Sequence, residues 1–263
     1  MNISVHITYF NNKNISNQTG ILEKNKIEYL KKIINNYNKF SHKVDIFIHT
    51  NSKIKFREKI SDKSIKVFEH SLNNENPRYL TWKCRMLIEK QINKYDVYIY
   101  SEDDVSFLKK NFLYWLKYKD LCLKNNYNLG FFRYEIKKTD KKRYLSDIMT
   151  SLNKFIKINN QKFIVNDVNP NCSFWILDNN ELKQFIKTKF WKFQWKGKNY
   201  KAFYDIEIMS AIGWHGKNMN RYKATIVPLI NNFPHINSFI HHLPNNYANK
   251  AGYKMLKTSN IIS

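Results

Sequence analysis

The sequence predicts an α/β fold in which a mostly parallel, mixed sheet is flanked by helices. Apolar runs of strand length alternate with stretches of helical periodicity through most of the chain. The clearest strand pattern lies at residues 96–105, where a run of β-branched and aromatic residues ends in three acids, Glu102, Asp103 and Asp104. The 263 residues are 43% hydrophobic, with only 6 Gly and 5 Pro, which is enough to build a sizeable core. We expect a single domain over residues 1–263, with halves at 1–105 and 106–263.

The first half contains most of the predicted sheet. We expect strands at 3–10, 44–50, 65–68 and 96–102, a polar loop at 11–20, and helices at 21–37 and 77–94. Ligands in folds of this kind collect at the carboxyl ends of the strands. Asn11, Asn51 and the three acids at 102–104 all fall at such ends.

The second half mixes helices with later strands. We expect helices at 107–123, 180–187 and 204–213, strands at 129–136, 174–177 and 226–230, and a solvated basic insertion at 137–143. The aromatic and lysine mixture at 190–200 is either a stacking platform or a half-buried hydrophobic rim. No P-loop, GxGxxG, GxSxG or CxxC motif is present.

The formal charge of +24 favours an anionic partner, such as nucleic acid, a membrane surface or a phosphate-bearing substrate. However, the lysines are scattered, and Lys, Asn and Ile are over-used together, a composition typical of an AT-rich genome. We therefore interpret most of the charge as compositional, with the remainder helping to attract a phosphate-bearing substrate.

Three isolated cysteines, Cys84, Cys122 and Cys172, fit reduced thiols in the core and give no zinc spacing. No apolar run has the length needed to cross a bilayer, and the first ten residues have the pattern of a strand rather than of a leader. We therefore expect a cytoplasmic protein without a transmembrane segment.

The acids after the strand at 96–102 are candidate ligands for a divalent cation, because clustered carboxylates at the end of an apolar strand repel one another unless a cation is near. In extended chain Glu102 and Asp104 point to the same side, so both can serve one ion. An acidic loop that caps the following helix is the alternative.

Several segments together resemble a family of glycosyltransferases of the GT-A (Rossmann-like) fold, found in plants, algae, protists and large DNA viruses. The matching segments follow one another in the expected order over most of the chain. They are Leu80-Thr-Trp82 with Arg85, Tyr100-Ser-Glu-Asp-Asp104, Gly130-Phe-Phe-Arg-Tyr-Glu135, Asn169-Pro170 with Phe174-Trp-Ile-Leu177, Glu207 with Ala211-Ile-Gly213, and His242-Leu-Pro-Asn-Asn-Tyr-Ala248. The last of these is the most distinctive.

The resemblance implies an inverting transfer of a sugar from a UDP- or GDP-sugar to a hydroxyl on a glycan, glycoprotein or other acceptor, with Mn²⁺ or Mg²⁺ as cofactor. Asp104 and His242 would be metal ligands, and Glu102 would act on the metal through water or on the donor's ribose. The remaining donor contacts would come from Thr8, Tyr9, Asn11, Thr50, Asn51, Arg85 and Asp103.

Glu207 is the candidate base that takes the acceptor's proton, and Asp205 is the runner-up. Both acids also fit a role that only complements a helix dipole, and Tyr9 also fits a core position. Lys83-Cys84 interrupts the first matching segment, and Glu102 replaces the first acid of the family's Asp-x-Asp motif. These departures bear on the identity of the donor.

Other functions remain open at this stage. A sugar-phosphate nucleotidyltransferase or a two-metal nuclease also uses clustered acids, but the first should carry a Gly-rich phosphate loop and the second more carboxylates. A nucleic-acid-binding module fits the charge and the aromatics at 191–200, but no recognised binding motif supports it.

Overall fold

The computed structural model describes residues 1–10, 23–52, 64–72, 75–192, 206–211 and 221–263. Its contacts divide the chain into two compact units. The first unit consists of Met1–Asp103 and Ser173–Trp214, and the second of Asp104–Cys172 and His215–Ser263. Whether the chain is a single domain stays a prediction, and each unit is described by itself.

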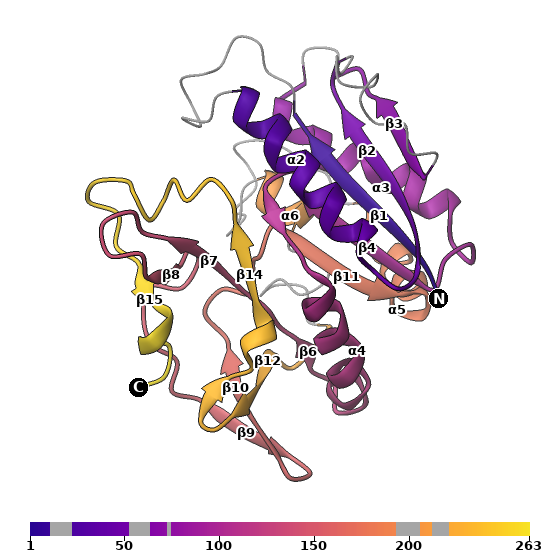
Figure 1. The fold of residues 1–263 in the computed structure, drawn as a ribbon. Coiled ribbons are helices and arrows are strands. Elements are labelled where there is room, and N and C mark those ends of the chain that lie inside the picture. The colour runs from indigo at the N-terminus through magenta and orange to yellow at the C-terminus, as the bar shows by residue number, and fades with distance from the viewer. Residues whose placement is uncertain (11–22, 53–63, 73–74, 193–205, 212–220) are drawn as a thin grey trace. The chain divides into compact units, whose positions relative to one another are not determined.

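The first unit is built on a five-stranded sheet of order β11-β4-β1-β2-β3 (Figure 1). Its strands are β1 (Asn2–Tyr9), β2 (Lys43–Thr50), β3 (Ile65–Glu69), β4 (Val97–Glu102) and β11 (Phe174–Asp178). All neighbours are parallel except β11, which runs antiparallel to β4. This confirms the predicted α/β fold with a mostly parallel, mixed sheet. The parallel strands bring their carboxyl ends to one edge, where Thr8 lies beside Glu102 in the register.

Helices cover both faces of this sheet. α2 (Glu23–Asn38) packs on the face that carries Asp103, since Lys26 Nζ on this helix lies 3.8 Å from Asp103 Oδ2. α3 (Leu80–Lys90) packs on the opposite face, which carries His6, Tyr100 and Glu102, and it follows the 3-10 turn η2 (Pro77–Tyr79). α5 (Asn179–Ile186) and α6 (Ile206–Ala211) complete the described helices of this unit.

The second unit contains two further sheets. In one, β13 (Phe233–Pro234), β12 (Thr225–Ile230), β10 (Gln161–Asn166) and β9 (Phe155–Ile158) lie in that order, and β6 (Asn128–Leu129) pairs with β12. In the other, β15 (Leu256–Lys257), β8 (Arg143–Leu145), β7 (Phe132–Ile136), β14 (Phe239–His242) and β5 (Val105–Ser106) lie in order.

A shared apolar core holds this unit together. It includes Phe132 from β7, Val227 from β12 and Phe239 from β14, all nearly inaccessible to solvent. The helix α4 (Lys109–Lys124) belongs to the same unit. None of the described helices has the length and apolar character needed to span a bilayer.

Two predicted elements are divided in the structure. The strand expected at 129–136 is divided into β6 and β7, with Gly130 and Phe131 between them. The backbone at Gly130 lies close to β12, where an added Cβ would be 2.4 Å from Thr225 Cγ2. The helix expected at 77–94 consists of η2 and α3 and ends at Lys90.

Candidate functional site

The second unit places a histidine between two carboxylates. His242 ends β14, Glu135 lies on the neighbouring parallel strand β7, and Asp104 directly precedes β5 on the other side of β14. The backbone carbonyl of Asp104 accepts a hydrogen bond from Leu243 N at 2.9 Å, which fixes the acid next to the end of β14. The strand pairing therefore brings together two of the predicted metal ligands, Asp104 and His242.

The imidazole contacts both acids directly. His242 Nδ1 lies 2.5 Å from Glu135 Oε1, and Nε2 lies 3.3 Å from Asp104 Oδ2. Glu135 is fully buried, and its second oxygen accepts from Ala248 N at 2.6 Å. Burial lowers the pKa of His242, but the charge of Asp104 and hydrogen bonds to Asp104 and Glu135 raise it to about 9. Without a metal the ring is therefore a buried cation held by two acids.

The same geometry fits a divalent cation. A carboxylate that holds one ring nitrogen of a metal-binding histidine fixes the tautomer and the direction of the other nitrogen. Glu135 is placed to do this for Nδ1, which leaves Nε2 directed at Asp104. Two ligand atoms that each lie about 2.1 Å from one ion are roughly 3 Å apart when the angle at the ion is near 90°.

Within the described parts of the chain, no group of three or more His, Cys, Asp or Glu side chains is arranged to hold a metal. The pair Asp104 and His242 therefore offers two ligand atoms, and other coordination positions would fall to a substrate or water. Glu102, the third predicted ligand, ends β4 in the first unit. Its part in metal binding stays a prediction.

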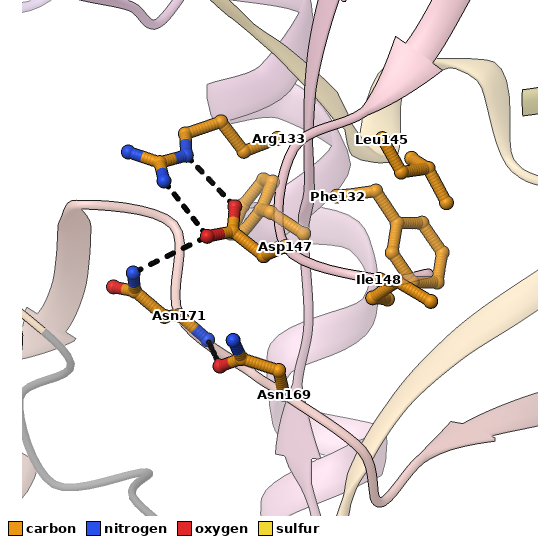
Figure 2. A pocket seen from close by; sticks show the side chains of 8 residues that line it. Phe132, Arg133, Leu145, Asp147, Ile148, Asn169 and Asn171 are labelled. Atoms are coloured by element: carbon orange, nitrogen blue, oxygen red, sulfur yellow. Dashed lines mark hydrogen bonds and ion pairs between the residues drawn. The ribbon is translucent and has the colours of Figure 1, made fainter. Parts of the chain in front are cut away.

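Arg133, which lies opposite Ile240 in the pairing of β7 with β14, forms an ion pair with Asp147 (Figure 2). Arg133 Nε and Nη2 donate to the two carboxylate oxygens of Asp147 at 2.8 and 2.7 Å, and Asn171 Nδ2 lies 3.5 Å from Asp147 Oδ1. These side chains line a small hollow that is too narrow for a water molecule. The hollow is therefore not a ligand pocket in this conformation.

The carboxyl edge of the first unit gathers other predicted residues. Thr8 Oγ1 lies 3.2 Å from Tyr100 OH, and both side chains are buried. Burial and the charges of Glu102 and Glu207 raise the pKa of Tyr100, so both carboxylates act on this one hydroxyl. Glu207, in the first turn of α6, also lies 3.7 Å from Arg78 Nε. Thr8 therefore lies beside both Tyr100 and Glu102 of β4, and the charge of Glu207 reaches the Tyr100 hydroxyl.

The other predicted donor contacts are at the same edge or outside the described residues. Thr50 is buried, and its hydroxyl donates to Ser52 O at 3.1 Å, while Asn51 is half-buried. Tyr9 is 1% exposed and has the burial of a core residue. Asp103 is buried, with Oδ2 3.8 Å from Lys26 Nζ. Asn11 and Asp205 lie outside the described residues.

Arg85 is buried and bonds backbone carbonyls of the first unit. It is 4% exposed, and its guanidinium donates to the backbone carbonyls of Phe190 and Trp191 at 2.8 Å and of Ser210 at 3.3 Å. Burial lowers its pKa to about 10. Contact with a donor diphosphate stays a prediction, but these bonds support a structural role.

Sequence reasoning gave no role to Glu135 or to three histidines in the first unit. His6 Nδ1 lies 3.0 Å from His49 Nε2, and His49 Nδ1 lies 2.8 Å from His70 Nε2. The inner end of this chain meets Gln91, whose Oε1 is 3.1 Å from His6 Nε2. A signal was available in each case, because Glu135 is an acid within an apolar strand, and His6 and His49 lie on one face of adjacent strands.

The three-histidine chain predicts acid sensitivity. Each neutral imidazole offers one donor and one acceptor, so an added proton would place N–H against N–H. Burial lowers the pKa of His6 from 6.5 to about 3 and lowers that of His49 well below 6.5. At a pH between a histidine's lowered pKa in the folded chain and 6.5, its value in the unfolded chain, the unfolded chain binds more protons than the folded one. The free energy of unfolding therefore falls as the pH drops below 6.5. At pH 5 we expect a loss of about 2 kcal/mol from His6 and a further loss from His49.

Denaturant unfolding at pH 7 and pH 5 measures this effect. A His49→Gln variant, which keeps a donor and an acceptor, should show a smaller pH dependence than the wild-type chain. His42→Gln, at a half-buried position outside the chain of imidazoles, is the matched control. An equal pH dependence in His49→Gln and the wild type would contradict the prediction.

Comparison with known proteins gives only a loose likeness. The sequence matches no family model and no curated protein sequence. Among solved structures, the chain is similar to S. aureus TarS, with 11% identity and a TM-score of 0.40 over 70% of this chain and 30% of TarS. It is also similar to the 1–349 segment of TarS, with 12% identity and a TM-score of 0.39 over 70% of this chain and 49% of that one. Because the chain spans less than half of either structure, function is inferred from its own residues.

Proposed function

We propose that this chain is a divalent-metal-dependent glycosyltransferase of the GT-A type. It would move a sugar from a nucleotide-sugar donor, a UDP- or GDP-sugar, to a hydroxyl acceptor with inversion. The observation that carries the proposal is the arrangement of His242 between Glu135 and Asp104. In a typical metal-binding histidine, one ring nitrogen is hydrogen-bonded to a carboxylate and the other is directed at the metal, which a second acid also binds.

Asp104 and His242 are the residues that would hold the cation. A mixed carboxylate and imidazole set favours Mn²⁺ over Mg²⁺, which prefers oxygen ligands and retains water. When bound, the cation supplies positive charge that stabilises the diphosphate leaving group. Glu135 keeps the imidazole oriented, and its own position is fixed by the bond from Ala248 N.

The carboxyl edge of the first unit would supply contacts to the donor's nucleoside. Thr8, Thr50 and Asn51 lie at the ends of parallel strands, where α/β folds bind ligands. Glu102 ends the neighbouring strand β4, and its carboxylate is a suitable acceptor for the hydroxyls of a ribose.

Glu207 would be the base that takes the proton of the acceptor hydroxyl. Its side chain is 40% exposed, so a substrate can reach it, and its Oε2 lies 3.7 Å from Arg78 Nε. An ionised carboxylate is the state that this role requires.

Binding of the donor tests the proposal. A UDP- or GDP-sugar at about 100 times its Kd should raise the melting temperature by roughly 5 to 10 °C with Mn²⁺ present, and far less after chelation. Glu207→Gln should retain this shift but lose sugar transfer, because the base acts on the acceptor. A shift of equal size without metal, or none with any sugar nucleotide, would contradict the proposal.

A further inference from the structure

A basic surface lies beside the candidate metal residues in the second unit. It is formed by the turn between β7 and β8 and by the chain that follows β14. Within residues 137–143 and 246–263 the sequence has eight Lys or Arg and one Asp, a balance of 8 − 1 = +7. We call this set the basic surface; its cations are Lys137, Lys138, Lys141, Lys142, Arg143, Lys250, Lys254 and Lys257.

The two segments are fastened to each other. Strand β15 pairs with β8, which puts Lys257 opposite Tyr144. Asn249 Oδ1 accepts from Lys138 N at 2.8 Å, and Asn245 Oδ1 accepts from Ile136 N at 2.7 Å. Figure 1 shows β15 alongside β8, with the chain beyond β14 returning past the β7–β8 hairpin. The cations therefore belong to one connected surface.

Most of these charges face solvent. Six of the eight residues are exposed, whereas Lys137 and Lys257 are half-buried with Nζ 5.5 and 6.0 Å from the centre of the Tyr144 ring. Asp140 is the one acid within these two segments, and its carboxylate accepts from Tyr144 OH at 2.7 Å and from Lys142 N at 3.0 Å. Like charges at this density repel one another, and a bound polyanion would relieve the repulsion.

The basic surface is continuous with the candidate metal residues. Glu135, which holds His242, lies opposite Tyr144 in the pairing of β7 with β8. The Tyr247 ring stacks on His242 with 5.6 Å between centroids, and Tyr253 lies 5.4 Å beyond Tyr247 with 36% of its surface exposed. A substrate lying on the basic surface would therefore be adjacent to Asp104 and His242.

We propose that the basic surface binds the acceptor and that the acceptor is an anionic glycan carrying several negative charges along its length. This inference rests on the proposed function, because the neighbouring metal residues make a sugar acceptor the expected occupant. Exposed lysines bind such a chain through many weak, salt-dependent contacts, which suits a polymer that must move after each transfer.

Binding of labelled oligosaccharides tests this proposal without metal or donor. The probes are a hyaluronate oligosaccharide, a neutral dextran of similar size and an oligo(dT) of equal charge, each followed by fluorescence anisotropy at low and high salt in EDTA. We expect hyaluronate to bind, dextran to bind at least tenfold more weakly, and the affinity for hyaluronate to fall as salt rises.

A pair of charge-matched variants locates the binding. Changing Lys138, Lys141, Lys142 and Lys254 to glutamine should weaken hyaluronate binding about tenfold or more. The control variant loses the same charge from four exposed lysines elsewhere in this unit, Lys109, Lys110, Lys124 and Lys157. Its affinity for hyaluronate should change by less than about twofold. Equal losses in the two variants, or tighter binding of oligo(dT) than of hyaluronate, would overturn the proposal.

The outcome is independent of the test of the metal residues. If the basic surface does not bind the acceptor, the variant with four lysines of that surface changed to glutamine should still show the Mn²⁺-dependent response to a sugar nucleotide. Conversely, a chain that bound hyaluronate normally but never responded to a sugar nucleotide would retain the surface and lose the proposed function.

Discussion

Replacing Asp104 by alanine is expected to lower metal-dependent sugar transfer by about 10³-fold or more. Asp104 offers one of the two ligand atoms that lie 3.3 Å apart, and its loss leaves His242 alone to hold the cation. A metal that stabilises a leaving group contributes several kcal/mol to the transition state, and each 1.36 kcal/mol corresponds to about a factor of ten in rate. Transfer from a sugar nucleotide at saturating Mn²⁺ measures this loss.

The fold should survive this change. The hydrogen bond between Asp104 and Leu243 uses the backbone carbonyl of Asp104, which alanine retains. The contact of His242 with Glu135 is also untouched. Asp120→Ala on α4 is the matched control, because its side chain is 69% exposed and bonds only Lys119 among the contacts described. Transfer in Asp104→Ala within about tenfold of the control would remove the metal assignment.

Most strands of the first unit were predictable from the sequence pattern. Alternation and apolar runs predicted β1, β2, β4 and β11 within a residue or two, because a strand's side-chain period is set locally. The β9–β10 hairpin was not predicted, since strands of four and six residues that each contain a lysine give little signal. Its existence depends on pairing with β12, which lies some 60 residues further along the chain.

The candidate site was predictable only in part. The acids after β4 stood out because they directly follow an apolar strand. No sequence pattern near Asp104 indicates that it lies next to His242, because the two residues are brought together by the pairing of β5 with β14. That connection came from the resemblance alone. The role of Glu135 requires knowing that β7 lies next to β14, a parallel pairing across about a hundred residues. The burial of Arg85 was likewise not predictable from the sequence, because its carbonyl partners lie more than 100 residues away along the chain.

Arg85 leads to the prediction with the largest effect on stability. Its guanidinium bonds three backbone carbonyls, two just beyond α5 and one on α6, and so ties α3 to both segments. It also lies 4.1 Å from the centre of the Trp82 ring and 4.9 Å from that of Trp191. Arg85→Ala removes the bonds and the packing together, and we expect a loss of about 4 kcal/mol in the free energy of unfolding.

Arg85→Lys separates the structural role from a role in phosphate binding. Lysine keeps the charge but cannot present a planar fork to the carbonyls or stack flat on Trp82, so it should recover only part of the lost stability. Arg78→Ala is the control, since this arginine is 53% exposed and its contact with Glu207 is worth at most about 1 kcal/mol. Denaturant midpoints of the three variants give the comparison.

Donor affinity in the folded Arg85→Lys protein then decides between the two roles. Because the guanidinium is 4% exposed and faces carbonyls and rings, we expect the metal-dependent response to a sugar nucleotide to be unchanged at a temperature where the variant is folded. A large loss of donor affinity with little loss of stability would place Arg85 at the diphosphate, as its position in the family segment first implied.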